Sequence, residues 1–344
     1  MSTLKLAVIG AGKRVQSDVL PVLATLSEQV ELVAVGARST RTVDFAGRPL
    51  PITALDELIA DGTLAACDVV YVVVAKGSVP AVVARLAAGG VTAPTLLLET
   101  PGLLLKHLGH LGKLAPFERV AMAEDCSRLP WLDVVSAAEA DGTLGPLQHV
   151  LLDRSAWRYH GMALMKALFG RASVRWARRV GRGDGARVEV HYSGGRSGVM
   201  VETRDYDAGH LVLTGAHGVV SDAPELVPDA TALQLVPGDW ESLELHLGDH
   251  VSVLPAEEAG LLSGFQSGDR VTAHTHGMKR IGLRRLLLTL AAGGDAWPLS
   301  EGLDDMLVDA LLEKARVYLG TPATAMTSPL GRALVSTLMR PLAR

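Results

Sequence analysis

The chain has 344 residues, of which 48% are hydrophobic and 20% are charged, and its formal net charge is −4. This composition supports a large buried core and excludes a disordered chain, and the lack of a basic excess excludes a nucleic-acid-binding protein. The most apolar run, Val69–Ala75, is much shorter than the roughly 20 residues of a membrane-spanning helix. The N-terminus shows no signal peptide, and Cys67 and Cys126 form no CxxC pair, so we expect a cytoplasmic protein.

The first hundred residues alternate short apolar runs with helical patterns. Strands are predicted at Leu4–Ile9, Val30–Val35, Val69–Ala75 and Thr95–Glu99, and helices from the first glycines to about Leu26, near Asp56–Ala60 and at Val79–Ala88. Valine- and leucine-rich strands separated by helices are typical of a parallel sheet covered on both faces. We therefore expect an α/β domain with a parallel sheet over residues 1–120, ending near Arg119–Asp125.

The pattern changes in the rest of the chain, where most strands are separated by turns alone. Helices are predicted at Leu103–Leu114, Trp131–Ala140, Tyr159–Phe169, Met278–Ala292 and Leu303–Leu319, and strands within Gly142–Asp153 and at Val188–Tyr192, Gly198–Thr203, His210–Leu213, Gly218–Ser221 and Leu243–Leu247. Residues 121–344 should thus form an α+β domain with a mostly antiparallel sheet. Asp304 and Asp305 are expected in the first turn of the last helix, where carboxylates favour the helix dipole.

A glycine-containing turn directly follows the first predicted strand. Gly10 permits a tight turn, and Gly12 lets the backbone approach a pyrophosphate at the N-terminus of the next helix. Val15 occupies the third position of the GxGxxG pattern, so the motif is incomplete, and a purely structural turn is the alternative. The residues of this turn predicted to bind a dinucleotide are Gly10, Gly12, Lys13, Arg14 and Val15.

The choice of cofactor is read at the end of the second predicted strand. A carboxylate there would bind the ribose hydroxyl of NAD, but this chain offers none. Two guanidinium groups and two hydroxyl groups suit a 2′-phosphate, which arginine binds with paired hydrogen bonds. We therefore predict NADP(H), bound by Arg38, Ser39, Thr40 and Arg41, while a solvated basic loop is the alternative.

Several segments together resemble one known family. They are the opening Ala7–Arg14 with Leu20-Pro21, the strand end Leu97-Leu98-Glu99-Thr100-Pro101, the segments Arg128-Leu129-Pro130 and Gly142–Gly145, and His160 with Gly170. Over about Leu4 to Gly320 the chain resembles the glucose–fructose oxidoreductase/inositol dehydrogenase (Gfo/Idh/MocA) group. The resemblance implies a Rossmann domain, an open-faced α/β domain, a nicotinamide cofactor, and dimers or tetramers.

Two positions depart from that family. Its signature lysine, a proton donor and substrate ligand, is Thr100 here, and the aspartate three residues after the histidine is Ala163. Only His160 of this catalytic set remains, at a helix start that faces the nicotinamide in relatives. The segments 36–39 and 72–77 resemble the thiazolinyl imine reductase branch, which lacks the lysine and reduces a C=N bond with NADPH in siderophore biosynthesis.

The candidate catalytic residues are His160, Tyr159 and Thr100. Reducing a ketone requires a proton, which threonine supplies poorly near neutral pH, so His160 or Tyr159 would supply it. A core or helix-start histidine is the alternative for His160, and Thr100 is expected to line the site. Lys166 lies about 240° around the helix from His160, so we expect a solvated charge. Two further strand-end residues join the predicted cofactor site, Ala75 and Glu99, the latter either contacting the cofactor amide or stabilising its loop.

The sequence thus predicts an NADPH-dependent oxidoreductase that reduces an imine or ketone of a small molecule, in specialised-metabolite biosynthesis. The alternative is a cofactor-binding sensor or partner subunit without turnover. No metal site is expected, because the histidine pairs His107/His110 and His246/His250 lack a third ligand. Self-association through one face of the second sheet is expected from alternating residues, namely Val188, Val190, Val199, Val201, Leu211 and Leu213.

Overall fold

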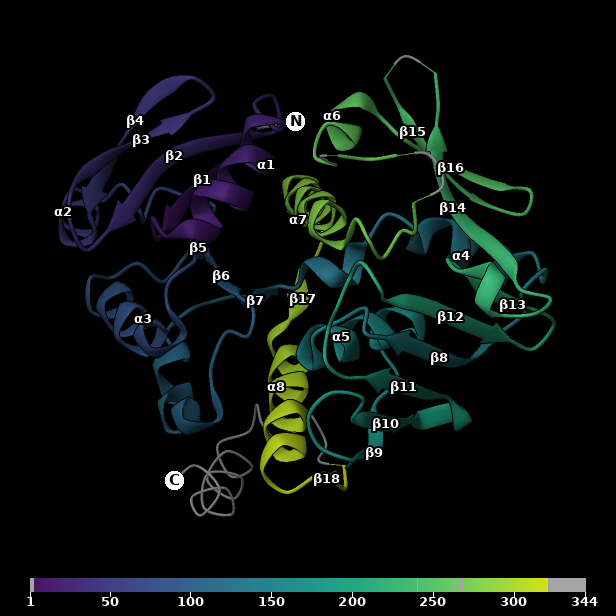
Figure 1. Ribbon diagram of the computed structural model, residues 1–344. Coiled ribbons are helices and arrows are strands. Elements are labelled where there is room, and N and C mark those ends of the chain that lie inside the picture. Colours follow the sequence, from purple (N-terminus) through teal and green to yellow (C-terminus); the bar gives the residue numbers. More distant parts are fainter. Residues whose placement is uncertain (1–2, 240, 263, 267–268, 321–344) are drawn as a thin grey trace. The chain divides into compact units, whose positions relative to one another are not determined.

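The computed structural model describes residues 3–320 except 240, 263 and 267–268, and this part of the chain divides into two compact units (Figure 1). The first unit comprises the described residues up to 124 together with residues 283–306. The second comprises those between 125 and 282 together with residues 307–320. The chain returns to the first unit because the short strand Trp297–Pro298 pairs with Ala121 and Met122 of that unit's sheet.

The first unit contains an eight-stranded sheet in the order β17-β7-β6-β5-β1-β2-β4-β3 (Figure 1). Its strands are β1 (Leu4–Ile9), β2 (Val30–Ala37), β3 (Arg41–Phe45), β4 (Arg48–Ala54), β5 (Val69–Val72), β6 (Thr95–Glu99), β7 (Val120–Ala123) and β17 (Trp297–Pro298). Its helical segments are η1 (Val15–Val19), α1 (Leu20–Ala24), α2 (Leu55–Ala60), η2 (Lys76–Ser78), α3 (Val79–Ala88) and η3 (Leu105–Leu114).

Strand β1 lies at the centre of this sheet and runs parallel to both β2 and β5. Its residues Leu6, Ala7 and Val8 are fully buried, as the continuous apolar pattern predicts. The strand order reverses at β1, and in such sheets ligands bind in the crevice at the carboxyl ends of the strands around the reversal. The parallel sheet of the predicted Rossmann domain is confirmed.

The sequence analysis missed the hairpin of β3 and β4 at the edge of this sheet. Ala46 and Gly47 turn the chain with φ values of 52° and 76°, the positive values that a two-residue hairpin turn requires. The strand expected over Val69–Ala75 ends earlier, at Val72, although the N–H of Val73 still donates to the carbonyl of Ile9 in β1. The helix after the glycines begins with a π-helical turn, η1, before α1.

The second unit contains a ten-stranded sheet in the order β16-β15-β14-β13-β12-β8-β11-β10-β9-β18. Its strands are β8 (Leu147–Asp153), β9 (Val174–Val180), β10 (Arg187–Tyr192), β11 (Ser197–Val201), β12 (His210–Gly215), β13 (Val219–Ser221), β14 (Thr231–Pro237), β15 (Leu243–Leu247), β16 (His250–Leu254) and β18 (Val317–Tyr318). Only β8 with β11 and β13 with β14 pair in parallel, so the predicted mostly antiparallel sheet is confirmed.

Helices accompany this second sheet. They are η4 (Asp125–Arg128), α4 (Leu132–Ala140), α5 (Arg158–Leu168), η5 (Ser193–Gly195), η6 (Pro224–Leu226), α6 (Ala256–Ala259), α7 (Thr275–Ala291) and α8 (Leu299–Lys314), the last two being divided between the units. Because α8 begins at Leu299, the expectation that Asp304 and Asp305 lie in its first turn is wrong. Both carboxylates lie one turn further on and are buried.

The two faces of the second sheet have different environments. Helix α5 packs against β8 and β11, and its Gly161 lies over Leu152 and Met200. The strand register places four residues of the predicted apolar set on this helix-covered face, where they are buried: Val188, Val190, Leu211 and Leu213. Val199 and Val201 lie on the opposite face and are half-buried. The prediction that all six share one face is therefore wrong, because strand register decides which alternating positions coincide.

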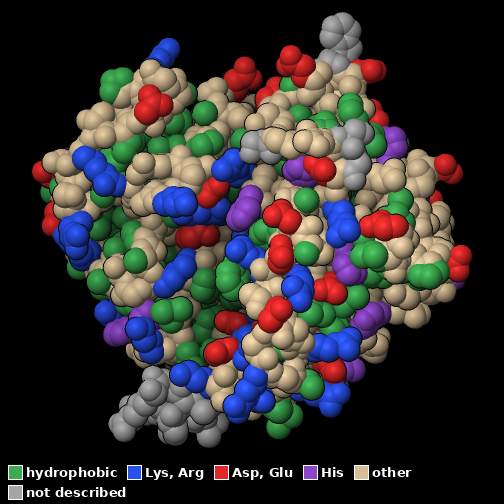
Figure 2. Space-filling model, viewed as in Figure 1, with side chains coloured by type: hydrophobic (Ala, Val, Ile, Leu, Met, Phe, Trp, Pro, Cys, Tyr) green, Lys and Arg blue, Asp and Glu red, His purple; other side chains and the backbone are tan. Residues whose placement is uncertain are grey.

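The surface carries charges of both signs. Figure 2 shows Lys and Arg side chains interspersed with Asp and Glu on the face in view, in keeping with the small net charge of −4. Within the described part of the chain, no helix combines the length and the hydropathy that crossing a bilayer requires.

Candidate functional site

The glycine turn after β1 is built for close approach of another backbone. Gly10 has φ +140°, and a Cβ added there would lie 1.9 Å from the carbonyl oxygen of Val73. A side chain at this position is therefore excluded both by the backbone conformation and by space. At Gly12, by contrast, an added Cβ would meet no atom within 4 Å, so the backbone borders open space. These two positions fit the tight turn and the accessible amide edge that a pyrophosphate needs.

A cavity of about 510 Å³ opens at this turn, at the carboxyl ends of β1, β2 and β5. Its polar edge includes Arg38 after β2, Ser78 of η2 and Arg85 of α3, and Gly10, Gly12 and Ala75 also line it. Among the described residues, no Asp or Glu lines this cavity. Arg85, which the sequence analysis missed, is exposed and forms an ion pair with Asp56. The cavity lining therefore contains two guanidinium groups, of which that of Arg85 is paired with Asp56, and no carboxylate from the described part of the chain.

The other predicted cofactor residues lie around this cavity rather than in its lining. Arg41 donates a hydrogen bond to the carbonyl of Ala11, so it holds the glycine turn itself. Arg14 forms ion pairs with Asp18 and Glu99, and Val15 is buried in the core. The remaining predicted residues are exposed: Lys13, Ser39 and Thr40.

Glu99, at the end of β6, gathers several donors around one carboxylate. The Tyr71 hydroxyl donates to Oε2 over 2.5 Å, and Arg14 Nε donates to the same oxygen over 3.2 Å. The backbone N–H of Thr100 donates to Oε1 over 3.1 Å, and the Thr100 hydroxyl lies 3.4 Å from that oxygen. Glu99 thus ties two neighbouring strand ends to the glycine turn, which favours the loop-stabilising interpretation.

Lys76, in η2, contacts the backbone where the signature lysine is replaced by Thr100. Lys76 Nζ donates to the carbonyl oxygens of Glu99 and Thr100, over 3.0 Å and 2.6 Å. The sequence analysis did not select Lys76, which lies in η2, four residues after the end of β5 and thus near the edge of the sheet where ligands bind. This ammonium places a positive charge beside Thr100, which itself is 6% exposed.

In the second unit, His160 lies in the first turn of α5 beside a lysine and a buried carboxylate. Lys279 Nζ of α7 lies 3.2 Å from His160 Nε2 and 3.4 Å from Asp125 Oδ1. The Asp125 side chain is 1% exposed and that of Lys279 is 13% exposed. The sequence analysis missed Lys279, because 119 residues separate it from His160.

His160 borders a small cavity of about 20 Å³ that Ser155 and Tyr206 also line. Burial raises the pKa of the Tyr206 phenol, while its hydrogen bond with Arg204 and the charge of Lys279 act in the opposite direction. Ser155 is 6% exposed, and its hydroxyl has no hydrogen-bond partner among the described residues. The cavity therefore offers a histidine, a phenol and a hydroxyl to one small polar group.

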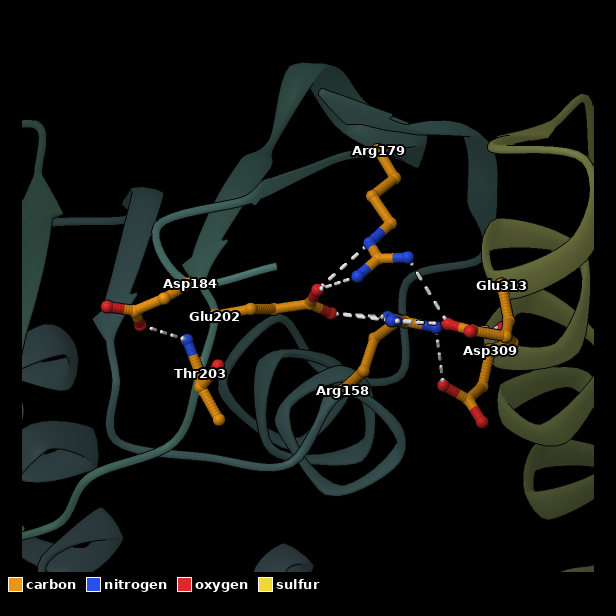
Figure 3. A network of polar contacts seen from close by, with 7 residues as sticks. All are labelled: Arg158, Arg179, Asp184, Glu202, Thr203, Asp309 and Glu313. Atoms are coloured by element: carbon orange, nitrogen blue, oxygen red, sulfur yellow. Dashed lines mark hydrogen bonds and ion pairs between the residues drawn. The ribbon is translucent and has the colours of Figure 1, made fainter. Parts of the chain in front are cut away.

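Tyr159 and Lys166 lie apart from this cavity. Tyr159 is buried, meets the His160 ring edge-on at 5.4 Å, and lines a different cavity of about 440 Å³. That cavity contains the ion-pair network of Arg158 (Figure 3). The expectation that Lys166 is solvated is wrong, because α5 is apolar around most of its circumference and Lys166 is fully buried within it.

His160 also belongs to a group of three potential metal ligands in the second unit. Asp125, Cys126 and His160 each offer a ligand atom, and these atoms lie within 4.8 Å of one another. The sequence analysis did not find this group, since its considered histidine pairs lie elsewhere. The Lys279 ammonium contacts both Asp125 and His160, so a cation already stands among these atoms and would repel a metal ion.

The fold is similar to that of several solved oxidoreductases. An oxidoreductase of Thermotoga maritima matches with a TM-score of 0.60 at 15% identity, over 94% of this chain and 100% of its own. An oxidoreductase of Agrobacterium radiobacter in complex with NAD+, L-tartaric acid and magnesium matches with a TM-score of 0.58 at 16% identity, over 94% and 100%. A levoglucosan dehydrogenase in complex with NADH and levoglucosan matches with a TM-score of 0.59 at 12% identity, over 92% and 97%.

These likenesses extend over both units of the chain. The fold is that of the Gfo/Idh/MocA oxidoreductases. Neither a scan against models of known protein families nor a search among curated proteins finds a match. At these identities the likeness establishes the Gfo/Idh/MocA fold expected from the motifs, and chemistry must be argued from the site itself.

Proposed function

We propose that the protein is an NADP(H)-dependent oxidoreductase that reduces a C=N or C=O bond of a small molecule. The observation that carries this proposal is the cavity at Gly10 and Gly12, which Arg38 borders and no described carboxylate does. A 2′-phosphate is attracted by a guanidinium and repelled by a carboxylate, so this lining favours NADP(H) over NAD(H). Two solved structures of the same fold contain NAD+ or NADH, which supports a nicotinamide dinucleotide in general.

A reduced nicotinamide supplies a hydride when bound, so the chain's residues bind, orient and provide a proton. Gly10 and Gly12 would hold the pyrophosphate, and Arg38 the 2′-phosphate. Thr100, bound to Glu99, is a poor acid, and Ala163 has no ionisable group. An imine arrives already protonated at moderate pH, whereas a ketone does not. The missing lysine therefore favours an imine substrate, in line with the resemblance to the imine reductase branch of specialised-metabolite biosynthesis.

The reaction is tested by following NADPH oxidation with two cyclic imines and one cyclic ketone of similar size. We expect turnover of cyclic imines, methylpyrroline and methylthiazoline, and slower turnover of the ketone cyclopentanone. A protein that binds NADPH but oxidises it with none of these compounds would support the alternative of a sensor or partner subunit. Titration of NADPH fluorescence in the same samples separates failure to bind from failure to react.

Cofactor preference provides a separate prediction. We expect the wild-type protein to bind NADPH more tightly than NADH, and Arg38→Ala to weaken NADPH binding about 10- to 100-fold while leaving NADH binding nearly unchanged. Fluorescence titration with both cofactors measures this. Arg48→Ala, at the exposed start of β4, is the control and should change neither affinity. Equal wild-type affinities for the two cofactors would contradict the assignment.

We also propose that the chain forms a homodimer or homotetramer through the face of the second sheet opposite α5. Leu151, Val199 and Val212 lie on that face and are half-buried, next to a stacked pair of rings, Trp176 and His191. Val199→Lys places a charge on this face, opposite Glu189, without disturbing the covered core. Sedimentation should show an oligomer at micromolar concentration for the wild type and for the Leu226→Lys control on exposed η6, and a monomer for Val199→Lys. A monomeric wild type refutes this assembly.

A further inference from the structure

The lysine missing at Thr100 leaves the proposed reaction without an obvious proton source, and the second unit contains a lysine in contact with His160. Lys279 Nζ lies 3.2 Å from His160 Nε2 and 3.4 Å from the buried carboxylate of Asp125. The ion pair with Asp125 favours the charged ammonium. Because an ammonium only donates hydrogen bonds, His160 Nε2 must accept, and a neutral ring then carries its proton on Nδ1.

We propose that Lys279, held by Asp125, replaces the missing signature lysine as proton source and acts through His160. This inference rests on the proposed function, since it concerns the proton that reduction of a C=N bond requires. Asp125 and Lys279 are positioning residues in this scheme, and His160 is the group that meets the substrate. The small cavity beside His160 has room for one small polar group, and the buried Ser155 hydroxyl there would gain a hydrogen-bond partner from such a group.

The proposed proton transfer is balanced at each atom. The Nδ1–H bond of His160 breaks as an N–H bond forms on the substrate nitrogen. An Nζ–H bond of Lys279 breaks as an Nε2–H bond forms on His160, which leaves Lys279 as a neutral amine beside Asp125. Proton uptake from water at Nδ1 then returns the Nε2 proton to Lys279 and restores the starting state. The two electrons reach the substrate carbon with the hydride, so these residues move only protons.

Two variants of Lys279 separate proton supply from charge. Lys279→Met removes the ammonium, whereas Lys279→Arg keeps a positive charge and donors for His160 and Asp125 but releases no proton near neutral pH. Lys314→Met, at an exposed position near the end of α8, is the matched control. Each protein is measured in two ways: by the tautomer of His160 in proton–nitrogen correlation spectra, assigned with His160→Gln, and by the pH profile of kcat for methylpyrroline with NADPH.

We expect wild type and Lys279→Arg to show the Nδ1–H tautomer of His160, and Lys279→Met to show a mixture of tautomers. Both Lys279 variants should lose about 10²- to 10⁴-fold in kcat above neutral pH, while Lys314→Met stays at the wild-type rate. Full rate in Lys279→Arg would overturn the proposal, because charge alone would then suffice. A wild-type tautomer in Lys279→Met would overturn the coupling between Lys279 and His160. Lys76→Met is measured in the same way, and a loss of rate confined to this variant would overturn the assignment of Lys279 as the proton source. If the wild type reduces none of the imines with NADPH, the proposed function fails, and proton supply by Lys279 fails with it. The spectra still decide in that case whether Lys279 sets the tautomer of His160.

Discussion

Arg158→Ala is expected to lower the free energy of unfolding by about 1–3 kcal/mol, because it removes a largely buried cation that three carboxylates share. The Arg158 side chain, at the start of α5, is only 11% exposed. It forms ion pairs with Glu202 over 2.6 Å, with Asp309 over 3.1 Å and with Glu313 over 3.1 Å (Figure 3). Arg179 shares Glu202 and Glu313, so one guanidinium would remain for three carboxylates.

The same substitution should change how stability depends on pH. Burial raises the pKa of Asp309, and the charge of Arg158 opposes that rise. A carboxyl group with a raised folded-state pKa holds a proton that the unfolded chain releases, so stability falls as the pH rises from the unfolded value towards the folded one. Without Arg158 the folded-state pKa of Asp309 should rise further, and the fall should extend to higher pH.

Denaturant unfolding followed by tryptophan fluorescence at several pH values measures both effects. Arg154→Ala is the matched control, since Arg154 is a neighbouring arginine whose ion pair with Asp184 is mostly exposed. An exposed pair contributes about 0–1 kcal/mol, so this control should remain close to the wild type. Equal losses in the two variants would mean that the Arg158 network behaves as an ordinary surface network.

The elements that the sequence predicted best are those in which one local pattern determines the structure. The continuous apolar run of β1 followed by Gly10 requires a buried strand and a tight turn, and both are present. The hairpin of β3 and β4 was missed because its strands are mostly exposed and carry no strong alternation, although Gly47 marks the turn. Register between distant strands, which decides the faces of Val188 and Val199, depends on pairing that no single segment encodes.

In the candidate site, too, residues that lie within one local segment were predicted from the sequence, and residues that distant segments bring together were not. The sequence selected the glycine turn and Arg38, which line one cavity, because they lie within one strand–turn–helix segment and at the end of the next strand. Lys279 was missed because it approaches His160 from a helix more than a hundred residues away. Arg41, also predicted to bind the cofactor, donates a hydrogen bond to the backbone carbonyl of Ala11, a contact that the sequence did not suggest. Chemistry that depends on one segment can be predicted from the sequence, and chemistry assembled from several segments requires the fold.

The largest effect on turnover is expected for His160→Ala, with a loss of about 10²- to 10⁴-fold in kcat, the usual contribution of a general acid. His160 borders the cavity beside Ser155 and Tyr206 and contacts Lys279, so its removal takes away both the donor and its connection to the lysine. Thr100→Ala should cost much less, because the Thr100 hydroxyl lies 3.4 Å from Glu99 and is a poor acid. Cofactor affinity should change little, since His160 does not border the cavity at Gly10 and Gly12.

The pH profile distinguishes a proton donor from a structural histidine. At low pH an imine substrate brings its own proton, so His160→Ala should be nearest to the wild type there and most impaired above neutral pH. The kcat of methylpyrroline reduction across this range, with NADPH affinity measured in parallel, tests the expectation. A uniform loss at all pH values would indicate that the ring only supports the start of α5. If the pH profile of His160→Ala equals that of the wild type, no proton reaches the substrate through His160. Hydride delivery would then depend on positioning alone.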